Sequence, residues 1–256
     1  MRNTGSADRA AVTTLILASA SPRRQELIAL LGLSFSIVPS RYEEPAPPTS
    51  PVDIPAFVTT LALNKGVEVA QRRQAELMQG AFVIAADTLV TIADADIGVP
   101  LGKPSDADDA LRMLRQLSGR THRVYTGIAV IASINALRSK ASGSDEEQTE
   151  RDKGLRGHMP FSSDVSPETI LPPGLVLKTA AVCTRVRFRA MSDDMIANYV
   201  ATGEPMDKAG SYGAQGCAAP FIESFEGDFF NVVGLPLCRL GQLLESMGVV
   251  WGISQV

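Results

Sequence analysis

The segment Ser19-Ala20-Ser21-Pro22-Arg23-Arg24 carries hydroxyl and guanidinium groups in a pattern suited to binding an anion. Ser21 is a favourable helix N-cap residue, and Pro22 fits the first helical position, where its missing N–H costs nothing. Arg23 and Arg24 then fall in the first turn, where the helix dipole disfavours each cation by roughly 0.3–1 kcal/mol. A bound anion would remove that penalty and would accept from free backbone N–H groups, hydroxyls and guanidinium groups. The segment therefore predicts an anion site, with two solvated surface arginines as the alternative.

Three acidic residues could provide oxygen ligands for a divalent metal. Asp87 interrupts an apolar run and would be costly to bury unless it is paired or metal-bound. Glu43 and Glu44 stand just before a proline-rich stretch and could join Asp87 around Mg²⁺, which binds carboxylate and phosphate oxygens. The alternatives are that Asp87 caps a turn at a strand end and that the two glutamates are ordinary exposed acids.

Two lysines and a glycine-rich loop complete the set of candidate site residues. Lys65 lies in a mostly apolar helical pattern and Lys103 follows a glycine, so either could reach a phosphate. The loop Gly210–Gly216 would allow a ligand to approach the backbone closely, and Gln215 within it offers a donor and an acceptor to the edge of a base. The alternatives are solvated lysines and a plain tight loop.

Several common catalytic and phosphate-binding motifs are absent. The sequence has no GxxxxGK[ST] loop, no GxGxxG after a strand and no HExxH. Its only histidines, His122 and His158, stand in unrelated contexts, so a Ser-His-Asp mechanism is poorly supported and a structural role is favoured for His122.

Strand and helix patterns alternate along the chain and predict an α/β protein with a mixed sheet. Short apolar or alternating runs predict strands at 14–18, 81–90, 124–133 and 180–189. Helices are expected after Arg24 up to Gly32, over 56–74, from an N-cap at Ser105 to Gly119, from an N-cap at Ser192 to Gly203, and over about 236–247. Pro45–Pro55 is expected to be a loop.

The stretch from Arg138 to Gly174 differs in composition from the rest of the chain. It is rich in Ser, Asp, Glu, Lys, Gly and Pro and has no sustained period, which predicts a surface loop or disordered insertion. The strands on either side are expected to pair as a hairpin. We predict a flexible lead-in over residues 1–13 and a single domain over 14–256 that contains this insertion.

Composition limits the class of protein and of partner. The 256 residues suffice for a sizeable core, and the net charge of −4 makes a nucleic-acid polymer an unlikely partner. The three cysteines, Cys183, Cys217 and Cys238, form no CxxC pair, so we expect a reduced, cytoplasmic compartment. No apolar stretch approaches the roughly 20 residues of a bilayer span, and no membrane partner is expected.

Five ordered blocks resemble the Maf family, the septum-formation inhibitor family of nucleotide pyrophosphatases. The first is the opening motif Ser19–Leu27 (SASPRRQEL). The others are Leu61–Lys65 (LALNK), Ala86–Val90 (ADTLV), Leu101–Pro104 (LGKP) with Leu117–His122 (LSGRTH), and the run from Gly203–Gly210 (GEPMDKAG) through Gln215-Gly216 to Asn231–Pro236 (NVVGLP). The resemblance spans Leu15 to about Leu244, apart from the insertion.

The resemblance implies an elongated α/β fold, similar to that of inosine triphosphate pyrophosphatases, with two lobes around a deep nucleotide-binding cleft and often a homodimer. It implies cleavage of a nucleoside triphosphate to the monophosphate and diphosphate, with Mg²⁺ or Mn²⁺. Asp87 would activate water, and Glu43 and Asp87 would help hold the metal. Ser21, Arg24, Lys65 and Lys103 would bind the phosphates. The spacing leaves Glu43 and Glu44 both open as the family's acid, and Glu43 is preferred here.

Three positions distinguish the branches of that family. The chain has Arg23, Thr88 and Gln215 there, which resembles the branch that acts on dTTP and UTP, including some modified pyrimidines. A glutamine can match the donor–acceptor edge of uracil or thymine, whereas a glutamate suits a cationic methylated guanine. Two other functions remain open: an inosine triphosphate pyrophosphatase, and a regulator of cell division that binds nucleotides without cleaving them.

Overall fold

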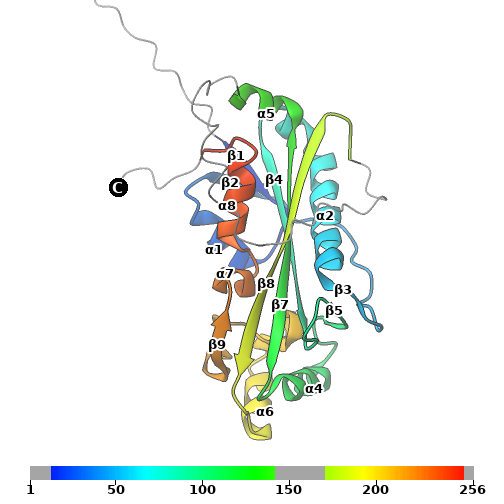
Figure 1. Ribbon diagram of the computed structural model, residues 1–256, viewed down its shortest axis with the longest axis vertical. Coiled ribbons are helices and arrows are strands. Elements are labelled where there is room, and N and C mark those ends of the chain that lie inside the picture. Colours follow the sequence, from blue (N-terminus) through cyan, green and yellow to red (C-terminus); the bar gives the residue numbers. More distant parts are fainter. Residues whose placement is uncertain (1–12, 142–170, 251–256) are drawn as a thin grey trace, which may run out of the picture.

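The structure is a computed structural model and describes residues 13–141 and 171–250 (Figure 1). In chain order its strands and helices are β1 (Thr14–Leu17), α1 (Pro22–Ala29), β2 (Ser34–Ile37), β3 (Val52–Asp53), α2 (Ile54–Arg72), α3 (Gln74–Met78), β4 (Phe82–Thr91), β5 (Ile97–Gly98), β6 (Pro100–Leu101), α4 (Ala107–Leu117), β7 (Thr121–Ser133), α5 (Ile134–Ala141), β8 (Leu175–Phe188), α6 (Asp193–Ala201), β9 (Ile222–Glu226), α7 (Phe229–Val233) and α8 (Leu237–Glu245). None of the helices in these ranges is long and apolar enough to cross a membrane.

The central sheet is mixed, as the alternating sequence patterns predict. Its strand order is β2-β1-β4-β7-β8-β9, and β6 pairs with the end of β4. The β1 strand is parallel to both β2 and β4, whereas β4, β7, β8 and β9 pair antiparallel. The chain is therefore an α/β protein with a mixed sheet between helices.

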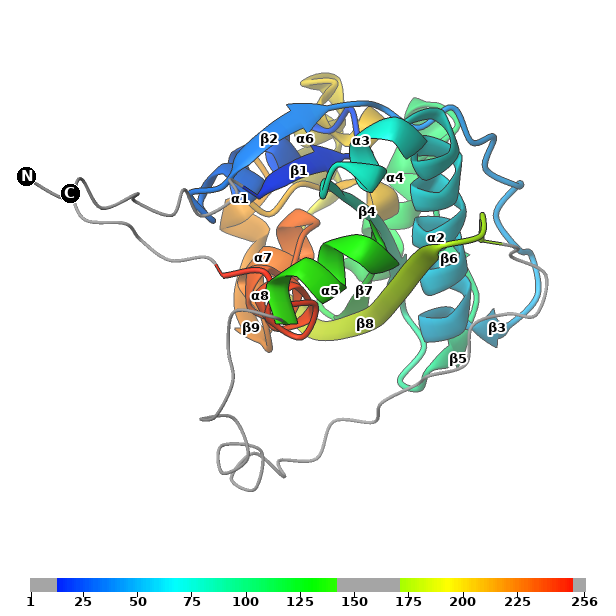
Figure 2. The same cartoon turned by 90° about the horizontal axis from the view of Figure 1, so that it is seen from above.

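Alternating residues of the central strands point to opposite faces of the sheet and pack into two separate hydrophobic cores, one on each face. On one face Leu15 and Leu17 pack with helices α1 and α8, and on the other Ile16 packs against α2. The same alternation continues along β4 and β7, whose residues from Phe82 to Ala86 and from Ile128 to Ala132 are fully buried. Figure 2 shows α2 on one side of the sheet and α7 and α8 on the other.

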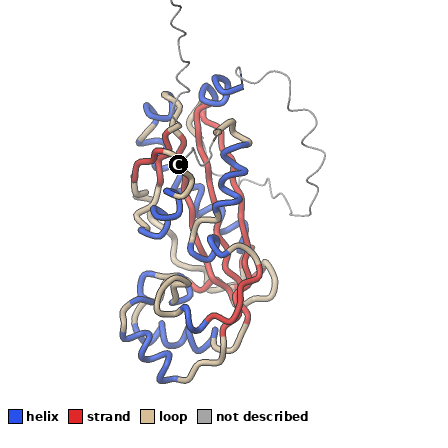
Figure 3. The backbone as a smooth tube through the Cα atoms, turned by 90° about the vertical axis from the view of Figure 1, so that its left-hand side faces the viewer, coloured by secondary structure: helices blue, strands red, loops and turns tan. Residues whose placement is uncertain are grey.

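The long strands continue past these two cores into a third. Val90, Val124 and Val186, near the ends of β4, β7 and β8, pack with helices α4 and α6. Figures 1 and 3 show this group of helices at one end of the molecule, below the part where α2 lies. The β4, β7 and β8 strands therefore connect the parts of the molecule that α2 and α4 cover.

The predicted hairpin around the insertion is confirmed. The β7 and β8 strands pair without interruption from Thr121 opposite Arg187 to Ser133 opposite Leu175. Both strands are longer than the sequence pattern suggests. The α5 helix covers the first residues of the stretch predicted as a loop or disordered insertion, up to Ala141, so the prediction is wrong for these residues. Residues 142–170, and residues 1–12 of the lead-in predicted over 1–13, lie outside the described residues.

Two predicted helix starts are wrong by a small number of residues. The α4 helix is capped by Asp106, not Ser105, because Asp106 Oδ1 accepts from the backbone N–H of Asp109 at 2.8 Å. The α2 helix begins at Ile54, inside the proline-rich stretch predicted as a loop. Pro55 is compatible with that start because the first helical turn does not need its N–H.

Candidate active site

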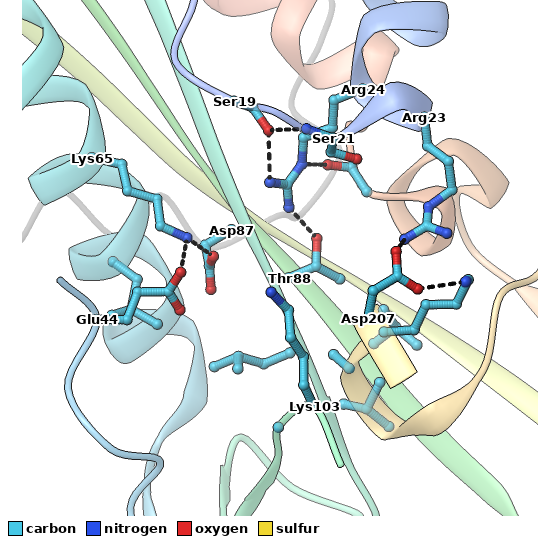
Figure 4. A pocket seen from close by; sticks show the side chains of 18 of the residues that line it. Ser19, Ser21, Arg23, Arg24, Glu44, Lys65, Asp87, Thr88, Lys103 and Asp207 are labelled. Atoms are coloured by element: carbon cyan, nitrogen blue, oxygen red, sulfur yellow. Dashed lines mark hydrogen bonds and ion pairs between the residues drawn. The ribbon is translucent and has the colours of Figure 1, made fainter. Parts of the chain in front are cut away.

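One pocket collects nearly all of the residues singled out by their chemistry. It has a volume of about 770 Å³ and lies between the start of α1, the loop around residue 42, α2, β4 and the segment 207–215. Its lining includes Ser19, Ser21, Arg23, Arg24, Lys65, Asp87, Thr88 and Lys103 (Figure 4). Gln215 also belongs to the lining. Glu43 is not part of this lining, whereas its neighbour Glu44 is.

The loop before α1 presents backbone and hydroxyl donors to the pocket. Ser21 is the N-cap residue and Pro22 is in the first turn, as predicted, but the Ser21 hydroxyl accepts no capping hydrogen bond. The Ser21 backbone N–H instead donates to Ser19 Oγ at 3.2 Å, which folds the loop back on itself. The Ser21 hydroxyl is therefore not used by the helix and can donate to a ligand.

Arg24 is held by hydrogen bonds although it lies at the N-terminus of α1, where the helix dipole disfavours a cation. Its Nε donates to the carbonyl of Gly234 at 2.8 Å, and its Nη2 donates to Thr88 Oγ1 at 3.0 Å. A longer contact of 3.5 Å joins Nη1 to Ser19 Oγ. Burial lowers the pKa of Arg24, and nearby Asp87 opposes that shift, so the guanidinium remains charged. Several of its N–H groups remain available to an anion in the pocket.

Lys65 joins two carboxylates across the pocket from Arg24. Its Nζ contacts Asp87 Oδ1 and lies 2.7 Å from Glu44 Oε1 (Figure 4). Burial raises the pKa of Asp87 even though Lys65 and Arg24 both act to lower it. Burial also acts to raise the pKa of Glu44, but Lys65, Lys103 and Arg24 outweigh it and the net pKa is lowered. The two acids therefore differ: Asp87 attracts a proton and Glu44 stays ionised.

A glycine in the neighbouring strand lets α2 bring Lys65 to Asp87. Gly127 lies opposite Asp87 in the β4–β7 ladder. A Cβ at Gly127 would lie only 2.5 Å from the carbonyl oxygen of Val58 in α2. The helix backbone thus rests directly on the strand, at a separation that any side chain would prevent.

Glu44 enters the pocket because the loop before it is tied to α2. Glu68 Oε2 accepts from the backbone N–H of Arg41 at 2.9 Å and from Ser40 Oγ at 3.1 Å. Asn64 Nδ2 donates to Tyr42 Oη at 3.1 Å, one turn along the same helix. These contacts decide which of the two adjacent acids faces Lys65. The structure thus places Glu44 beside Lys65 and Asp87, and it does not bring Glu43 to them.

The pocket has a surplus of positive charge in a protein whose net charge is negative. Its charged lining residues are Arg23, Arg24, Lys65, Lys103 and Lys208 against Glu44, Asp87 and Asp207. Lys65 pairs with Glu44 and Asp87, while Arg23 and Lys208 pair with Asp207. Arg24 and Lys103 form no ion pair with any residue that the structure describes. Their charges are therefore available to an anionic ligand.

Gln215 lies on a loop that is wrapped around the carboxylate of Glu204. Glu204 Oε2 accepts from the backbone N–H of Cys217 at 2.8 Å, and Glu204 Oε1 accepts from Tyr199 Oη at 3.1 Å. A Cβ at Gly216 would lie 2.1 Å from Glu204 Oε1, so a side chain there would force either the loop or the Glu204 carboxylate to move. The glycine-rich stretch thus has a specific structural cause: it curls tightly around Glu204 and presents Gln215 to the pocket.

His122 is buried and does not line this pocket, although its partner Tyr212 does. Its Nε2 lies 2.7 Å from Tyr212 Oη, and its ring packs edge-on against Phe188 and Tyr212. Burial lowers the pKa of His122 to about 3, which keeps the ring neutral at physiological pH. This environment agrees with the structural role favoured from the sequence.

The carboxylates suit a metal that shares its ligands with a substrate. No group of three or more His, Cys, Asp or Glu side chains that could hold a metal occurs among the described residues. Asp87 and Glu44 both face the pocket, and each uses one carboxylate oxygen on Lys65. Mg²⁺ is commonly held by one or two carboxylates together with substrate phosphates and water, so this donor set fits it.

Sequence reasoning missed several lining residues. Tyr42, Asp207, Lys208 and Gly234 all face the pocket, and the last supplies the carbonyl that holds Arg24. Asp207, Lys208 and Gly234 lie within the blocks that resemble the Maf family, and that position in the sequence could have identified them as site residues. Tyr42 carries no motif of its own; it is placed there by tertiary contacts with Asn64 and with the apolar cluster around Val58.

Comparisons with known proteins agree on one family. A model of the Maf-like protein family matches residues 14–153 and 173–247. A dTTP/UTP pyrophosphatase of Moorella thermoacetica is 42% identical over 246 residues, covering 94% of this chain and 99% of the relative. A dTTP/UTP pyrophosphatase of Geobacter sulfurreducens is 40% identical over 92% of this chain and 97% of its own. A probable bifunctional dTTP/UTP pyrophosphatase/methyltransferase protein of Homo sapiens is 38% identical over 87% of this chain and 30% of its own length.

Proposed function

Because the chain belongs to the Maf-like protein family, we propose that it is a nucleoside triphosphate pyrophosphatase that converts dTTP and UTP to the monophosphate and diphosphate. The relatives described above carry that activity in their names, and their similarity extends over nearly the whole chain. The observation that carries the proposal is the combination, in one pocket, of the cations Arg24 and Lys103 with the buried carboxylate of Asp87. Cations bind the phosphates, and the carboxylate acts on water.

Asp87 is the proposed general base. Its raised pKa makes its carboxylate a stronger proton acceptor than an exposed aspartate, which is the property a base needs near neutral pH. Lys65 contacts it directly and favours its ionised form, which is the form that accepts a proton. We propose that Asp87 orients a water molecule and removes its proton as the water oxygen attacks the α-phosphorus, while the bond from that phosphorus to the bridging oxygen breaks and diphosphate leaves.

The cationic residues stabilise the charge that develops on the leaving diphosphate. Arg24, Lys103 and the Ser21 hydroxyl all line the pocket. The Arg24 guanidinium is already held by Gly234 and Thr88, so this donor needs little reorganisation during reaction. We propose Asp87 and Glu44 as the protein ligands of a divalent metal, Mg²⁺ or Mn²⁺, in place of the pair Glu43 and Asp87 expected from the sequence. When bound, such a metal neutralises phosphate charge and polarises the phosphoryl group.

Arg23, Thr88 and Gln215 support dTTP and UTP as the substrates. All three line the pocket, and Gln215 offers the donor and acceptor that a pyrimidine edge requires. By resemblance we also propose that the protein acts as a homodimer in the cytoplasm, without nucleic-acid or membrane partners. The three free, exposed cysteines are compatible with a reducing compartment.

The test is to incubate the purified protein and Mg²⁺ with dTTP, UTP, CTP, ITP and 7-methyl-GTP and to identify the products. We expect monophosphate and diphosphate, formed fastest from dTTP or UTP. The Asp87→Asn variant should bind nucleotide without turning it over, while Asp193→Asn, a surface substitution that removes an ion pair with Arg115, should retain activity. Preference for ITP would refute the pyrimidine assignment, and binding without turnover in the unaltered protein would support a regulator instead.

A further inference from the structure

A single chain of hydrogen bonds runs from the pocket into the core. Arg24 Nη2 donates to Thr88 Oγ1 at 3.0 Å, and Thr88 Oγ1 lies 2.9 Å from Thr126 Oγ1. Thr126 Oγ1 in turn donates to the main-chain carbonyl of Asn231 at 2.9 Å. Thr88 and Thr126 are directly opposite each other in the β4–β7 ladder. Thr126 has no exposed surface and does not line the pocket.

The donor and the acceptor of each hydrogen bond in this chain follow from how many protons each group can donate. A guanidinium group only donates, so Thr88 Oγ1 must be the acceptor for Arg24. Thr126 has one hydroxyl proton, and the carbonyl of Asn231 can only accept, so that proton is used on Asn231. Thr126 therefore cannot donate to Thr88 and must accept the Thr88 proton. The Thr88 hydroxyl is thus fixed with its proton toward the core and a lone pair toward Arg24.

This fixed orientation matters because Arg24 has only two close acceptors among the residues that the structure describes. Thr88 Oγ1 and the carbonyl of Gly234 hold Nη2 and Nε, which fixes the plane of the guanidinium. Without the acceptor at Thr126, the Thr88 proton could turn toward Arg24. A buried N–H of Arg24 would then lose its partner, which is costly.

We infer that Thr126 is a positioning residue: it fixes the Thr88 hydroxyl and, through it, holds Arg24 in place to bind the phosphates of the substrate. The inference rests on the proposed function for the role of Arg24. It assigns a part in substrate binding to a side chain that does not itself line the pocket.

Paired substitutions at Thr126 separate the hydroxyl from the shape of the side chain. Thr126→Val keeps the shape and removes the hydroxyl, whereas Thr126→Ser keeps the hydroxyl. We expect Thr126→Val to raise the KM for UTP and the Kd for inorganic diphosphate by about two- to tenfold, the effect of one hydrogen bond. The kcat for UTP should fall as well, because Arg24 also stabilises the charge that develops on the leaving diphosphate. Thr126→Ser should restore all three constants.

Thr184→Val is a matched control in the adjacent strand. Thr184 is equally buried and also contacts Asn231, through the side-chain amide at 3.0 Å, and it bonds Asp228 rather than any residue of the pocket. Its replacement should lower Tm but leave the KM for UTP and the Kd for diphosphate unchanged. Equal weakening of diphosphate binding by Thr184→Val and Thr126→Val would overturn the inference.

A double-mutant cycle tests the route through Arg24. In an Arg24→Lys background, Thr126→Val should no longer alter the Kd for diphosphate, and a persisting effect would overturn the inference. Thr88→Val removes the next hydroxyl in the chain and must weaken diphosphate binding even if Thr126→Val does not fold.

The positioning role and the proposed function can fail separately. If the variants alter diphosphate binding as expected but the unaltered protein hydrolyses no nucleotide, the positioning role stands and the proposed function fails. If the protein hydrolyses UTP but Thr126→Val binds diphosphate as tightly as the unaltered protein, the proposed function stands and the positioning role fails.

Discussion

Gly127 provides the sharpest test of how the fold positions the site. A methyl group at this position would lie 2.5 Å from Val58 O and 2.8 Å from the backbone nitrogen of Thr59. Cβ atoms do not approach heavy atoms closer than 3.0 Å, so α2 and β7 would have to separate by at least about 0.5 Å. The neighbouring atoms are helix backbone and cannot rotate away. The same helix carries Lys65, so the separation would also draw Lys65 away from Asp87.

For Gly127→Ala we expect a loss of about 1–3 kcal/mol of unfolding free energy, the usual cost of overpacking, which lowers Tm by about 2–12 °C. We also expect kcat/KM for UTP to fall about ten- to hundredfold, because misplacement of a catalytic pair by up to 1 Å has effects of that size. Thermal unfolding and steady-state kinetics measure the two effects separately.

Gly66→Ala is the matched control, because Gly66 lies in α2 and faces the same sheet. A Cβ there would meet Ile131 Cδ1 at 3.1 Å and Ala85 Cβ at 3.3 Å, so the main neighbour is the end of a flexible side chain. The gain in helix propensity offsets the crowding, and the unfolding free energy should stay within about 1 kcal/mol of the unaltered protein. If Gly127→Ala matches the unaltered protein in both measurements, the close approach of α2 does not position the site.

Three further predictions concern the acids, the histidine and the Gln215 loop. Glu44→Gln should raise the Mg²⁺ concentration needed for half-maximal activity, while Glu43→Gln should not, because only Glu44 contacts Lys65 in the pocket; metal titrations of both variants decide this. His122 has a pKa of about 3 in the folded protein against about 6.5 when unfolded, so its contribution to stability is present above pH 6.5 and is lost as the pH falls toward 3, by up to about 1.4 kcal/mol per pH unit. Unfolding free energies at pH 7 and pH 5 should therefore differ more in the unaltered protein than in His122→Gln, and equal differences would contradict this. Gly216→Ala should reduce the preference for UTP over CTP, because a Cβ 2.1 Å from Glu204 Oε1 must displace either the loop that presents Gln215 or the Glu204 carboxylate around which that loop folds; competition assays with the two nucleotides measure it, and an unchanged preference would count against Gln215.

The sequence predicts the central part of the fold well because burial there is nearly complete. The β4 strand and the β7–β8 hairpin have long apolar or alternating runs, and local pattern suffices to find them. The β9 strand, Ile222–Glu226, was missed because it lies at the edge of the sheet and most of its residues are exposed. The β2 strand, also at an edge, alternates Ser34-Phe35-Ser36-Ile37, and this pattern could have revealed it.

The candidate site was predictable where the residue type itself was unusual for its position. An acid in an apolar strand and two arginines at a helix N-terminus both conflict with local preference, and both lie in the pocket. The choice between Glu43 and Glu44 could not be made from the sequence, because adjacent acids look alike. Tertiary contacts decide it: Asn64 and Glu68 bind the loop residues Tyr42 and Arg41 and so turn Glu44 inward.

The length of the β7–β8 hairpin has a practical consequence for experiments on this protein. Thr126, at the level of the pocket, is seven residues from Ser133, where the paired part of the hairpin ends opposite Leu175. That stretch corresponds to roughly 23 Å of extended strand. A label attached beyond Ser133 and Leu175 would therefore be well separated from the pocket. The label could be a fluorophore, an affinity tag or a tether to a solid support. Nucleotide binding could then be followed on labelled or immobilised protein without altering the residues that bind the nucleotide.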